Sequence, residues 1–301
     1  MPRTGILLVA AIILAVALSR CQVAHAGSLD EQSTPQSEPQ PRKTLLKWPG
    51  LTQGNNEEPD EPKRLDPDRP HLPESSTAVG KGRIVLESGY TLTKKGSSFT
   101  SQSYPEALLR IGMFADWFEL RLGQSFLSSE QTVAGVRTSV HGAQDLYLGV
   151  KLALVEQQGL LPEIALIPQM TVPTGSGAVG AGKVLPGLNV DCAWEVIKER
   201  FSIELLIATN DVQDDAHRAH VELATGLTGV FGLTPKLEAF GEWDAFSPVT
   251  PADGAAGPRH YAVGGFVYFI SKDVEVDIRA GVGLNQRAND FLAGTGLAVR
   301  Y

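Results

Sequence analysis

The sequence has little cysteine. Only Cys21 and Cys192 occur among its 301 residues, and Cys21 falls inside an expected secretory leader. The mature chain would therefore hold Cys192 alone, and an intramolecular disulfide is excluded. Cys192 lies in an alternating stretch, where a small apolar residue is the expected role. A secreted chain without disulfides must be stabilised by a large fold or by a membrane.

Long apolar runs are also missing. The longest candidate, Ile6–Leu18, is shorter than the roughly 18 residues that a spanning helix needs. It follows Arg3 and precedes Ala24-His25-Ala26, which predicts a signal peptide over residues 1–26, cleaved between Ala26 and Gly27. No later run is long enough, so the sequence predicts no transmembrane helix.

Positive charge is scarce as well, since the formal net charge is -8. This balance argues against nucleic acid as a partner. The chain has no G-x-S-x-G motif, and His217 and His220 form only a loose pair. Gly177–Lys183 has P-loop spacing, but Val184 stands where magnesium binding requires Ser or Thr. We therefore expect no enzyme, no metal and no cofactor.

Proline is concentrated in one region. Residues 27–79 hold nine of the nineteen prolines, together with many Glu, Asp, Gln and Ser. Such a composition buries too little apolar surface to offset the entropy of ordering, which predicts a disordered periplasmic linker. Its one apolar island is Thr44–Trp48. That island either docks into a barrel mouth or onto a partner, or is a chance cluster.

Period-two alternation dominates from residue 80 to residue 301. Val274, Val276 and Ile278 alternate with Glu275 and Asp277, for example. Alternating segments are expected at 82–93, 105–113, 117–127, 142–155, 162–172, 188–198, 200–210, 218–231, 235–246, 259–270, 273–284 and 290–301. A soluble sandwich would turn the apolar face inward, whereas a membrane barrel turns it toward lipid.

The connections favour the barrel. Short ones, such as Gly232–Thr234, alternate with longer ones expected at Lys94–Tyr104, Gln131–His141, Pro173–Gly187, Asp211–His217, Ser247–Pro258 and Asn285–Asn289. Short turns at one end and long loops at the other are typical of outer-membrane barrels. The sequence predicts an all-β, roughly 12-stranded antiparallel up-and-down transmembrane barrel over residues 80–301. An even strand number places the N-terminal arm and the C-terminus on the periplasmic side.

The last seven residues fit this interpretation. Thr295, Gly296, Val299 and Tyr301 follow the pattern polar, Gly, apolar, terminal aromatic. This pattern resembles the C-terminal signal by which bacterial outer-membrane barrels reach their insertion machinery. We therefore expect that machinery and outer-membrane lipid as partners.

Inward positions carry the charge if apolar faces meet lipid. The predicted pore-lining residues are Glu87, Arg110, Glu119, Arg121, Asp145, Lys151, Asp191, Glu204, Glu222, Glu242, Glu275, Asp277 and Arg279. Glu195, Glu238, Asp244 and Arg300 meet the same criterion. Two interpretations stay open: a polar constriction that selects solutes by charge, or an ion-pair network that fills a narrow barrel. Acidic residues outnumber basic ones here, so an open pore should favour cations.

Three motifs point to a family. Gly142–Lys151 resembles a G-x-G-D-L-x-L-G-x-K stretch, with Gln144 departing from the glycine pattern, and Pro173-Thr174-Gly175 resembles a P-T-G loop entry. Arg110-Ile111-Gly112 followed by Glu119-Leu120-Arg121 resembles an R-x-G…E-L-R hairpin. The chain thus resembles the outer-membrane family called "putative MetA-pathway of phenol degradation", or transporter. The resemblance implies a passive channel or uptake barrel for small solutes, with a link by name to aromatic compounds. The alternative is a closed structural or adhesive barrel; an outer-membrane enzyme is disfavoured.

Overall fold

The structure, a computed structural model, describes residues 43–48, 64–213, 218–249 and 257–301. The described residues form one antiparallel sheet. Its strands are β1 (Ile84–Lys95), β2 (Phe99–Ser103), β3 (Ala107–Gly112), β4 (Phe118–Gln124), β5 (Phe126–Val133), β6 (Val136–Ala143), β7 (Leu146–Val155), β8 (Glu163–Val172), β9 (Leu185–Ile197), β10 (Phe201–Gln213), β11 (Ala219–Thr234), β12 (Leu237–Pro248), β13 (Arg259–Ser271), β14 (Val274–Gly283) and β15 (Phe291–Arg300).

Three pairs of these strands lie end to end. The end-to-end pairs are β2 with β3, β5 with β4, and β6 with β7. Both β2 and β3 pair with β1. Next to them, β5 pairs with β2 and β4 pairs with β3, and then β6 pairs with β5 and β7 pairs with β4. The sheet therefore has twelve positions around its circumference. It closes where β15 pairs with β1 from Val85↔Arg300 to Lys94↔Phe291. The predicted 12-stranded barrel is confirmed, and closure leaves no unpaired edge between first and last strand.

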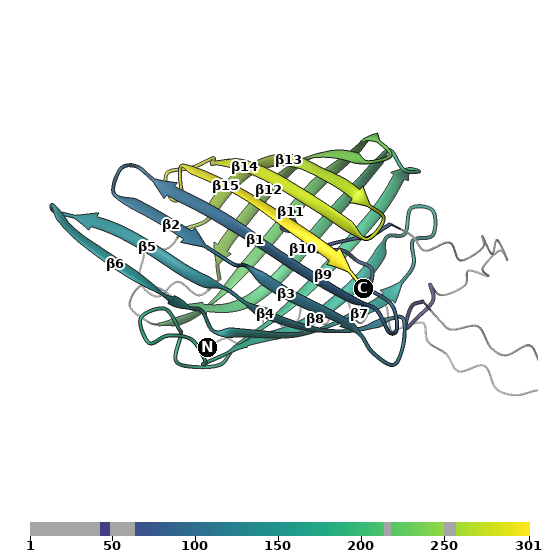
Figure 1. Ribbon diagram of the computed structural model, residues 1–301, viewed down its shortest axis with the longest axis horizontal. Coiled ribbons are helices and arrows are strands. Elements are labelled where there is room, and N and C mark those ends of the chain that lie inside the picture. Colours follow the sequence, from purple (N-terminus) through teal and green to yellow (C-terminus); the bar gives the residue numbers. More distant parts are fainter. Residues whose placement is uncertain (1–42, 49–63, 214–217, 250–256) are drawn as a thin grey trace, which may run out of the picture.

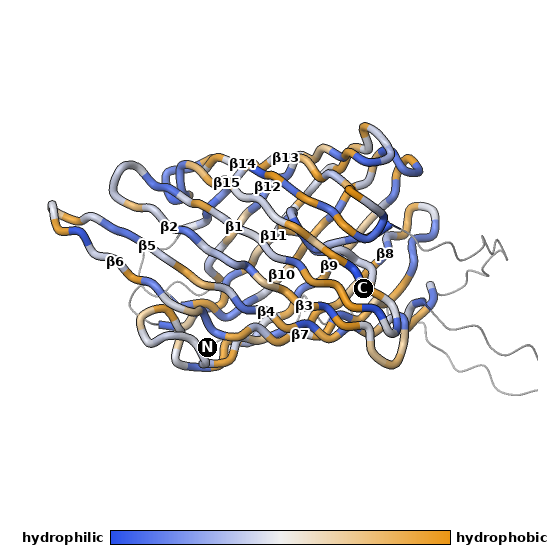
Figure 2. The backbone as a smooth tube through the Cα atoms, in the orientation of Figure 1, coloured by the Kyte–Doolittle hydropathy of each residue, from blue (hydrophilic) through white to orange (hydrophobic). Residues whose placement is uncertain are grey.

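The two faces of the sheet differ as the alternation predicts. In β14, Glu275 and Asp277 point inward and are buried, whereas Ile278 points outward and is 59% exposed. Figure 2 shows apolar and polar residues alternating along the strands. No helix among the described residues is long and apolar enough to cross a membrane. The exposed apolar band belongs to the outer surface of the barrel, where lipid would cover it.

The two ends of the barrel are unequal. Turns 198–200, 235–236 and 272–273 are tight and lie at the end that holds the C-terminus (Figure 1). We call this the short-turn end. The opposite, long-loop end holds the connection 173–184, among others. The β5–β6 hairpin extends beyond the rest of the sheet at this end.

Two expected long loops are strands instead. The predictions at Lys94–Tyr104 and Gln131–His141 are wrong, because β1–β2 and β5–β6 continue through them to tight turns. Ala134 and Gly135 both adopt positive φ, 51° and 82°, which suits a two-residue hairpin turn. Sequence alternation could not reveal these extensions, since Ser, Thr and Gln occupy both faces of Phe99–Ser103.

The N-terminal region also differs from the expected disordered linker over 27–79. Residues 64–79 lie inside the barrel, and Thr44–Trp48 lies at its rim. The amides of Leu45 and Leu46 donate to Ala153 and Leu154 of β7, and the Trp48 indole donates to the carbonyl of Glu156. The signal peptide, its cleavage site at Ala26 and Gly27, and the rest of the linker (27–42 and 49–63) lie outside the described residues.

Candidate functional site in the barrel lumen

Residues 64–79 form a luminal segment with bends at 68, 70–73 and 76–77, and residues 80–83 connect it to β1. Prolines 67, 70 and 73 have no amide hydrogen to satisfy. Wall carboxylates accept the amides of other segment residues: Glu87 from Asp68 and Arg69, Glu242 from Leu72, Asp191 from Glu74 and Glu119 from Val79, at 2.9–3.1 Å. Barrel side chains thus accept the backbone amide hydrogens of the segment, which would otherwise bond to water or to a neighbouring strand.

One side of the lumen, formed by β1, β3, β4 and β7, carries three buried cations. We call it the basic wall: Arg110, Arg121 and Lys151, with Glu87 and Glu119 between them. Arg110 and Arg121 are direct cross-strand neighbours. Glu119 accepts from Arg110 Nε at 2.8 Å and from Arg121 Nη1 at 3.0 Å, which offsets the repulsion between the two guanidinium groups.

Asp68 of the luminal segment completes the basic wall. Its carboxylate lies 2.6 Å from Arg121 Nη1, 2.7 Å from Lys151 Nζ and 3.3 Å from Arg110 Nη1. Burial alone would raise the pKa of Asp68, but the three cations outweigh it and hold that pKa well below its usual range. Glu74 adds a second segment carboxylate, 2.8 Å from Arg121 Nη2.

The opposite side, formed by β9 to β14, is an acidic wall. Its inward carboxylates are Asp191, Glu204, Glu222, Glu238, Glu242, Asp244, Glu275 and Asp277. The cations of the luminal segment face it: Arg64 pairs with Glu238, Arg69 with Asp277, and His71 Nδ1 lies 2.9 Å from Glu204. The adjacent segment residues Asp68 and Arg69 therefore point in different directions. Asp68 meets the cations of the basic wall, and Arg69 meets a carboxylate of the acidic wall.

Arg69 fits into a notch in the wall. Gly89 of β1 and Gly296 of β15 are register partners, and a Cβ on either would approach the Arg69 guanidinium to about 2.2 Å. The guanidinium donates to Asp277 at 3.2 Å and to Glu106 at 2.9 Å. A Cβ at either position would therefore force the Arg69 guanidinium to move from this site.

Apolar contacts secure the segment at two further points. Leu65 is buried against Val85 and Ala298, next to the short-turn end. Leu72 packs against Leu206 and Ala208 on β10, near Phe246. These contacts add the burial of two leucines to the polar network, and Val79 packs against the same cluster as Leu65.

A cavity of about 620 Å³ remains between the luminal segment and the long-loop end. Asp68, Arg69, His71 and Glu74 form its floor, and Val179, Ala181 and Gln213 lie at its other end. Its lining is mixed, with Leu108, Tyr147 and Leu185 beside charged groups. Toward the long-loop end, the side-chain amide of Gln169 donates to the side-chain oxygens of Asn189 and Asn210. Polar but uncharged groups therefore take the place of charged ones in this part of the lumen.

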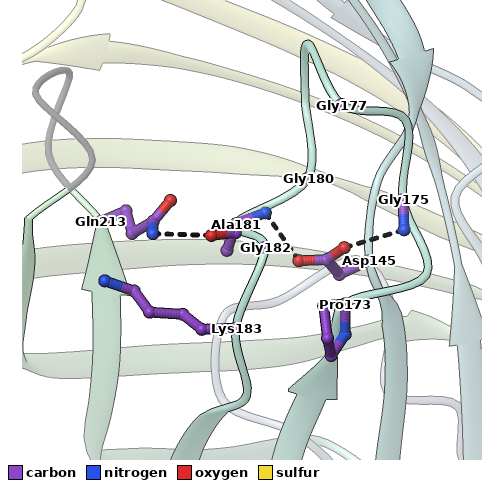
Figure 3. A pocket seen from close by; sticks show the side chains of 9 residues that line it. All are labelled: Asp145, Pro173, Gly175, Gly177, Gly180, Ala181, Gly182, Lys183 and Gln213. Carbon is purple, nitrogen blue, oxygen red and sulfur yellow. Dashed lines mark hydrogen bonds between the residues drawn. The ribbon is translucent and has the colours of Figure 1, made fainter.

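Asp145 clamps the loop 173–184 that borders this cavity. Its two oxygens accept the amides of Gly175 and Ala181 at 2.9 and 2.8 Å, and Gln213 donates to the Ala181 carbonyl (Figure 3). The loop encloses a second cavity of about 360 Å³, with Asp145, Ala181 and Gln213 shared between the two. The G-D-L and P-T-G motifs are therefore joined physically: Asp145 of the first holds the loop that begins with the second.

The structure places the predicted pore-lining residues on two walls and one loop. Glu87, Arg110, Glu119, Arg121 and Lys151 gather on the basic wall, while Asp191, Glu204, Glu222, Glu242, Glu275, Asp277 and Arg279 lie on the acidic side. Asp145 precedes β7 and holds a loop. Transport along these residues stays a prediction. Their expected preference for cations also stays a prediction, and several of the carboxylates accept amide hydrogens from the luminal segment.

Sequence reasoning missed the segment's own residues, above all Asp68, Arg69 and His71. A usable signal was the mixture of both charge signs from Arg64 to Arg69, which differs from the Glu-rich linker before it. Gly296, predicted as part of an insertion signal, forms half of the Arg69 notch. The insertion role of Thr295, Gly296, Val299 and Tyr301 stays a prediction.

The closed sheet, the apolar exterior and the charged lumen define an outer-membrane β-barrel. The chain belongs to the family described as "Putative MetA-pathway of phenol degradation", whose model matches residues 67–301. The predicted family is confirmed, and the match includes most of the luminal segment.

Solved structures agree at the level of fold. An outer membrane channel from Pseudomonas putida F1 superposes with a TM-score of 0.61 at 14% identity, covering 76% of this chain and 99% of that one. NanC porin gives 0.47 at 10% identity, covering 72% and 98%. The monoaromatic hydrocarbon channel CymD gives 0.40 at 11% identity, covering 74% and 88%. Only the first is similar enough to support a shared fold, and no curated protein matches the chain.

Proposed function

We propose that this protein is a passive outer-membrane channel for small solutes, with the luminal segment as its constriction. The observation that carries the proposal is the polar lumen of a closed barrel, in which a cavity of about 620 Å³ ends on residues 68–74. Twelve strands enclose a narrower lumen than the 16 or so of general porins. Small solutes are therefore favoured, and the family description makes small aromatic compounds the first class to test.

The orientation follows from the ends of the barrel. Outer-membrane barrels carry short turns on the periplasmic side and long loops outside. The N-terminal arm, the rim contact of Thr44–Trp48 and the C-terminus would then face the periplasm. The cavity above the luminal segment would open toward the cell exterior through the loop that Asp145 clamps.

A closed structural or adhesive barrel is the second candidate. The observation that favours it is the set of ion pairs by which the luminal segment bridges opposite walls, from Asp68–Lys151 on one to Arg69–Asp277 on the other. Such a network stabilises a filled lumen regardless of transport. We retain the expectation that the protein is not an enzyme.

Conductance in a planar bilayer separates the two candidates. The mature protein should give discrete steps, and Arg69→Ala should give larger ones, because it removes the side chain that ties the segment to Asp277 of β14 and Thr295 of β15. Arg137→Ala, which breaks only an exposed pair with Glu130 on the β5–β6 hairpin, is the matched control and should leave step size unchanged. Protein that inserts, as judged by heat-modifiable migration, yet gives no steps in either form would exclude the channel.

A further inference from the structure

Asp68 is held by the barrel as a ligand would be. Its carboxylate comes from the luminal segment and not from a strand, yet it occupies the point where Arg110, Arg121 and Lys151 converge, at 2.6–3.3 Å. All three cations are at most 1% exposed. We call these three side chains the cation site.

The cation site depends on the segment for its neutralisation. Within the part of the chain that the structure describes, Lys151 Nζ donates to the Asp68 carboxylate and to the Ser75 carbonyl, both of the segment, each at 2.7 Å. Arg121 would keep Glu119 and Tyr147 but lose Asp68 and Glu74. The wall alone therefore presents three cations to two carboxylates, Glu87 and Glu119. Withdrawal of the segment exposes a positive site that favours an anion.

The cavity leads to this site. Asp68 and Arg121 both line it, so a molecule in the cavity reaches the carboxylate and one of its cations. Leu108, Tyr147 and Leu185 line the same cavity and offer apolar surface to the body of a solute. A planar carboxylate suits the fork of Arg121, and a short apolar group suits the walls beside it.

We propose that the cation site binds the carboxylate of a small organic acid in place of Asp68, so that the luminal segment and a monocarboxylate solute compete for one position. This inference deepens the proposed function and rests on it for the route of the solute. The site itself requires no conduction and is tested without it.

The first test is chemical rescue. Asp68→Ala removes the carboxylate and leaves a space beside three cations, so the variant should unfold at a lower temperature than the wild type. Sodium acetate at 100 mM should raise its melting temperature by at least about 2 °C relative to sodium chloride at equal ionic strength, because a ligand of the folded state stabilises it by mass action. Asp273→Ala, which breaks a pair with Arg300 at the short-turn end, should show no such difference. Acetate that acts no better than chloride on Asp68→Ala would overturn the proposal.

The second test leaves Asp68 in place, and therefore holds even where Asp68→Ala fails to fold. Ser76 is 3% exposed inside the barrel. In a Cys192→Ser background, Ser76→Cys should react slowly with a charged thiol reagent and several-fold faster in the presence of benzoate, which displaces the segment. Benzamide, a neutral molecule of the same shape, should not accelerate the reaction. Equal effects of the two, or no effect of benzoate, would contradict competition at the cation site.

The same assay assigns the effect to the site. Lys151→Met removes one of the three cations, and in this background the benzoate acceleration should disappear. An acceleration that persists would place the benzoate elsewhere and overturn the proposal. A channel that fails to conduct while acetate and benzoate act as expected would refute the proposed transport and leave the carboxylate site standing.

Discussion

The basic and acidic walls hold the same luminal segment in different ways. On the basic wall, ions meet ions: Arg110, Arg121 and Lys151 are each paired with buried carboxylates. On the acidic wall, Glu238, Asp277 and Glu204 pair with side chains of the segment, and Glu242 and Asp191 accept its backbone amides. Carboxylate oxygens of Asp191, Asp244, Glu275 and Asp277 there have no hydrogen-bond partner among the described residues. Charge pairing thus holds the segment at both walls. Every cation of the basic wall meets a carboxylate, whereas the acidic wall keeps carboxylate oxygens that no described residue bonds.

Removing a cation should break this comparison most strongly. Arg110→Met leaves Glu87, Glu119 and Asp68 buried without their shared partner. Loss of one member of a buried pair costs about 3–5 kcal/mol, and we expect a fall of that size in the free energy of unfolding. Urea titration followed by tryptophan fluorescence measures it. Arg137→Met, at the exposed pair with Glu130, should cost no more than about 1 kcal/mol; equal losses for both variants would contradict the difference.

A matched pair of substitutions sharpens the contrast. Glu119→Gln should destabilise the barrel by about 2–3 kcal/mol, because Glu119 accepts charge-assisted bonds from two guanidinium groups. Glu242→Gln should cost only about 1 kcal/mol, since its partners are the Leu72 amide and the Thr228 hydroxyl and one amide oxygen remains. The same urea titration compares them. A larger loss for Glu242→Gln would reverse our assignment of the walls.

The notch for Arg69 gives a third test, on the acidic side. Gly296→Ala places a methyl group against the guanidinium and the Asp277 carboxylate, and overpacking of this kind costs about 1–3 kcal/mol. In a double-mutant cycle with Arg69→Ala, the two changes should cost less together than the sum of the singles. Strict additivity would show that Gly296 does not accommodate Arg69.

Protonation of His71 should have the smallest effect. Burial lowers the pKa of His71. Glu204, which is hydrogen-bonded to His71, and the nearby Glu242 and Glu238 raise this pKa by more than burial lowers it, so the net pKa lies above the usual 6.5. The resulting stabilisation is present in full below the unfolded-state pKa and is lost as the pH rises through the folded-state pKa. The stability difference between wild type and His71→Gln should therefore be larger at pH 5.5 than at pH 9. Unfolding at the two pH values checks this, and a larger difference at pH 9 would contradict the pairing with Glu204.

The wall of the barrel was predictable because its signals are local. The alternation of Glu275 and Asp277 with Val276 and Ile278 identifies the inward and outward faces of the strand. The tight turns between successive segments indicate that neighbouring strands run up and down in chain order. The luminal segment was not predictable in this way. Its prolines and charges resemble a solvated linker, and its partners lie far away in the sequence, as in the Asp68–Lys151 pair. Composition reports whether a stretch can bury apolar surface, but it cannot report that a distant wall supplies acceptors for its amides.

The glycine notch also bears on how the barrel assembles. One half, Gly89, belongs to the first strand and the other, Gly296, to the last, so the notch exists only after β1 and β15 have joined. The residue that fills it lies fifteen positions upstream of β1 and donates to Thr295 of β15 through Arg69 Nη2. The position that Arg69 occupies therefore requires the pairing of β1 with β15. Arg69, which belongs to neither strand, thus contacts the junction of β1 and β15 from inside the barrel.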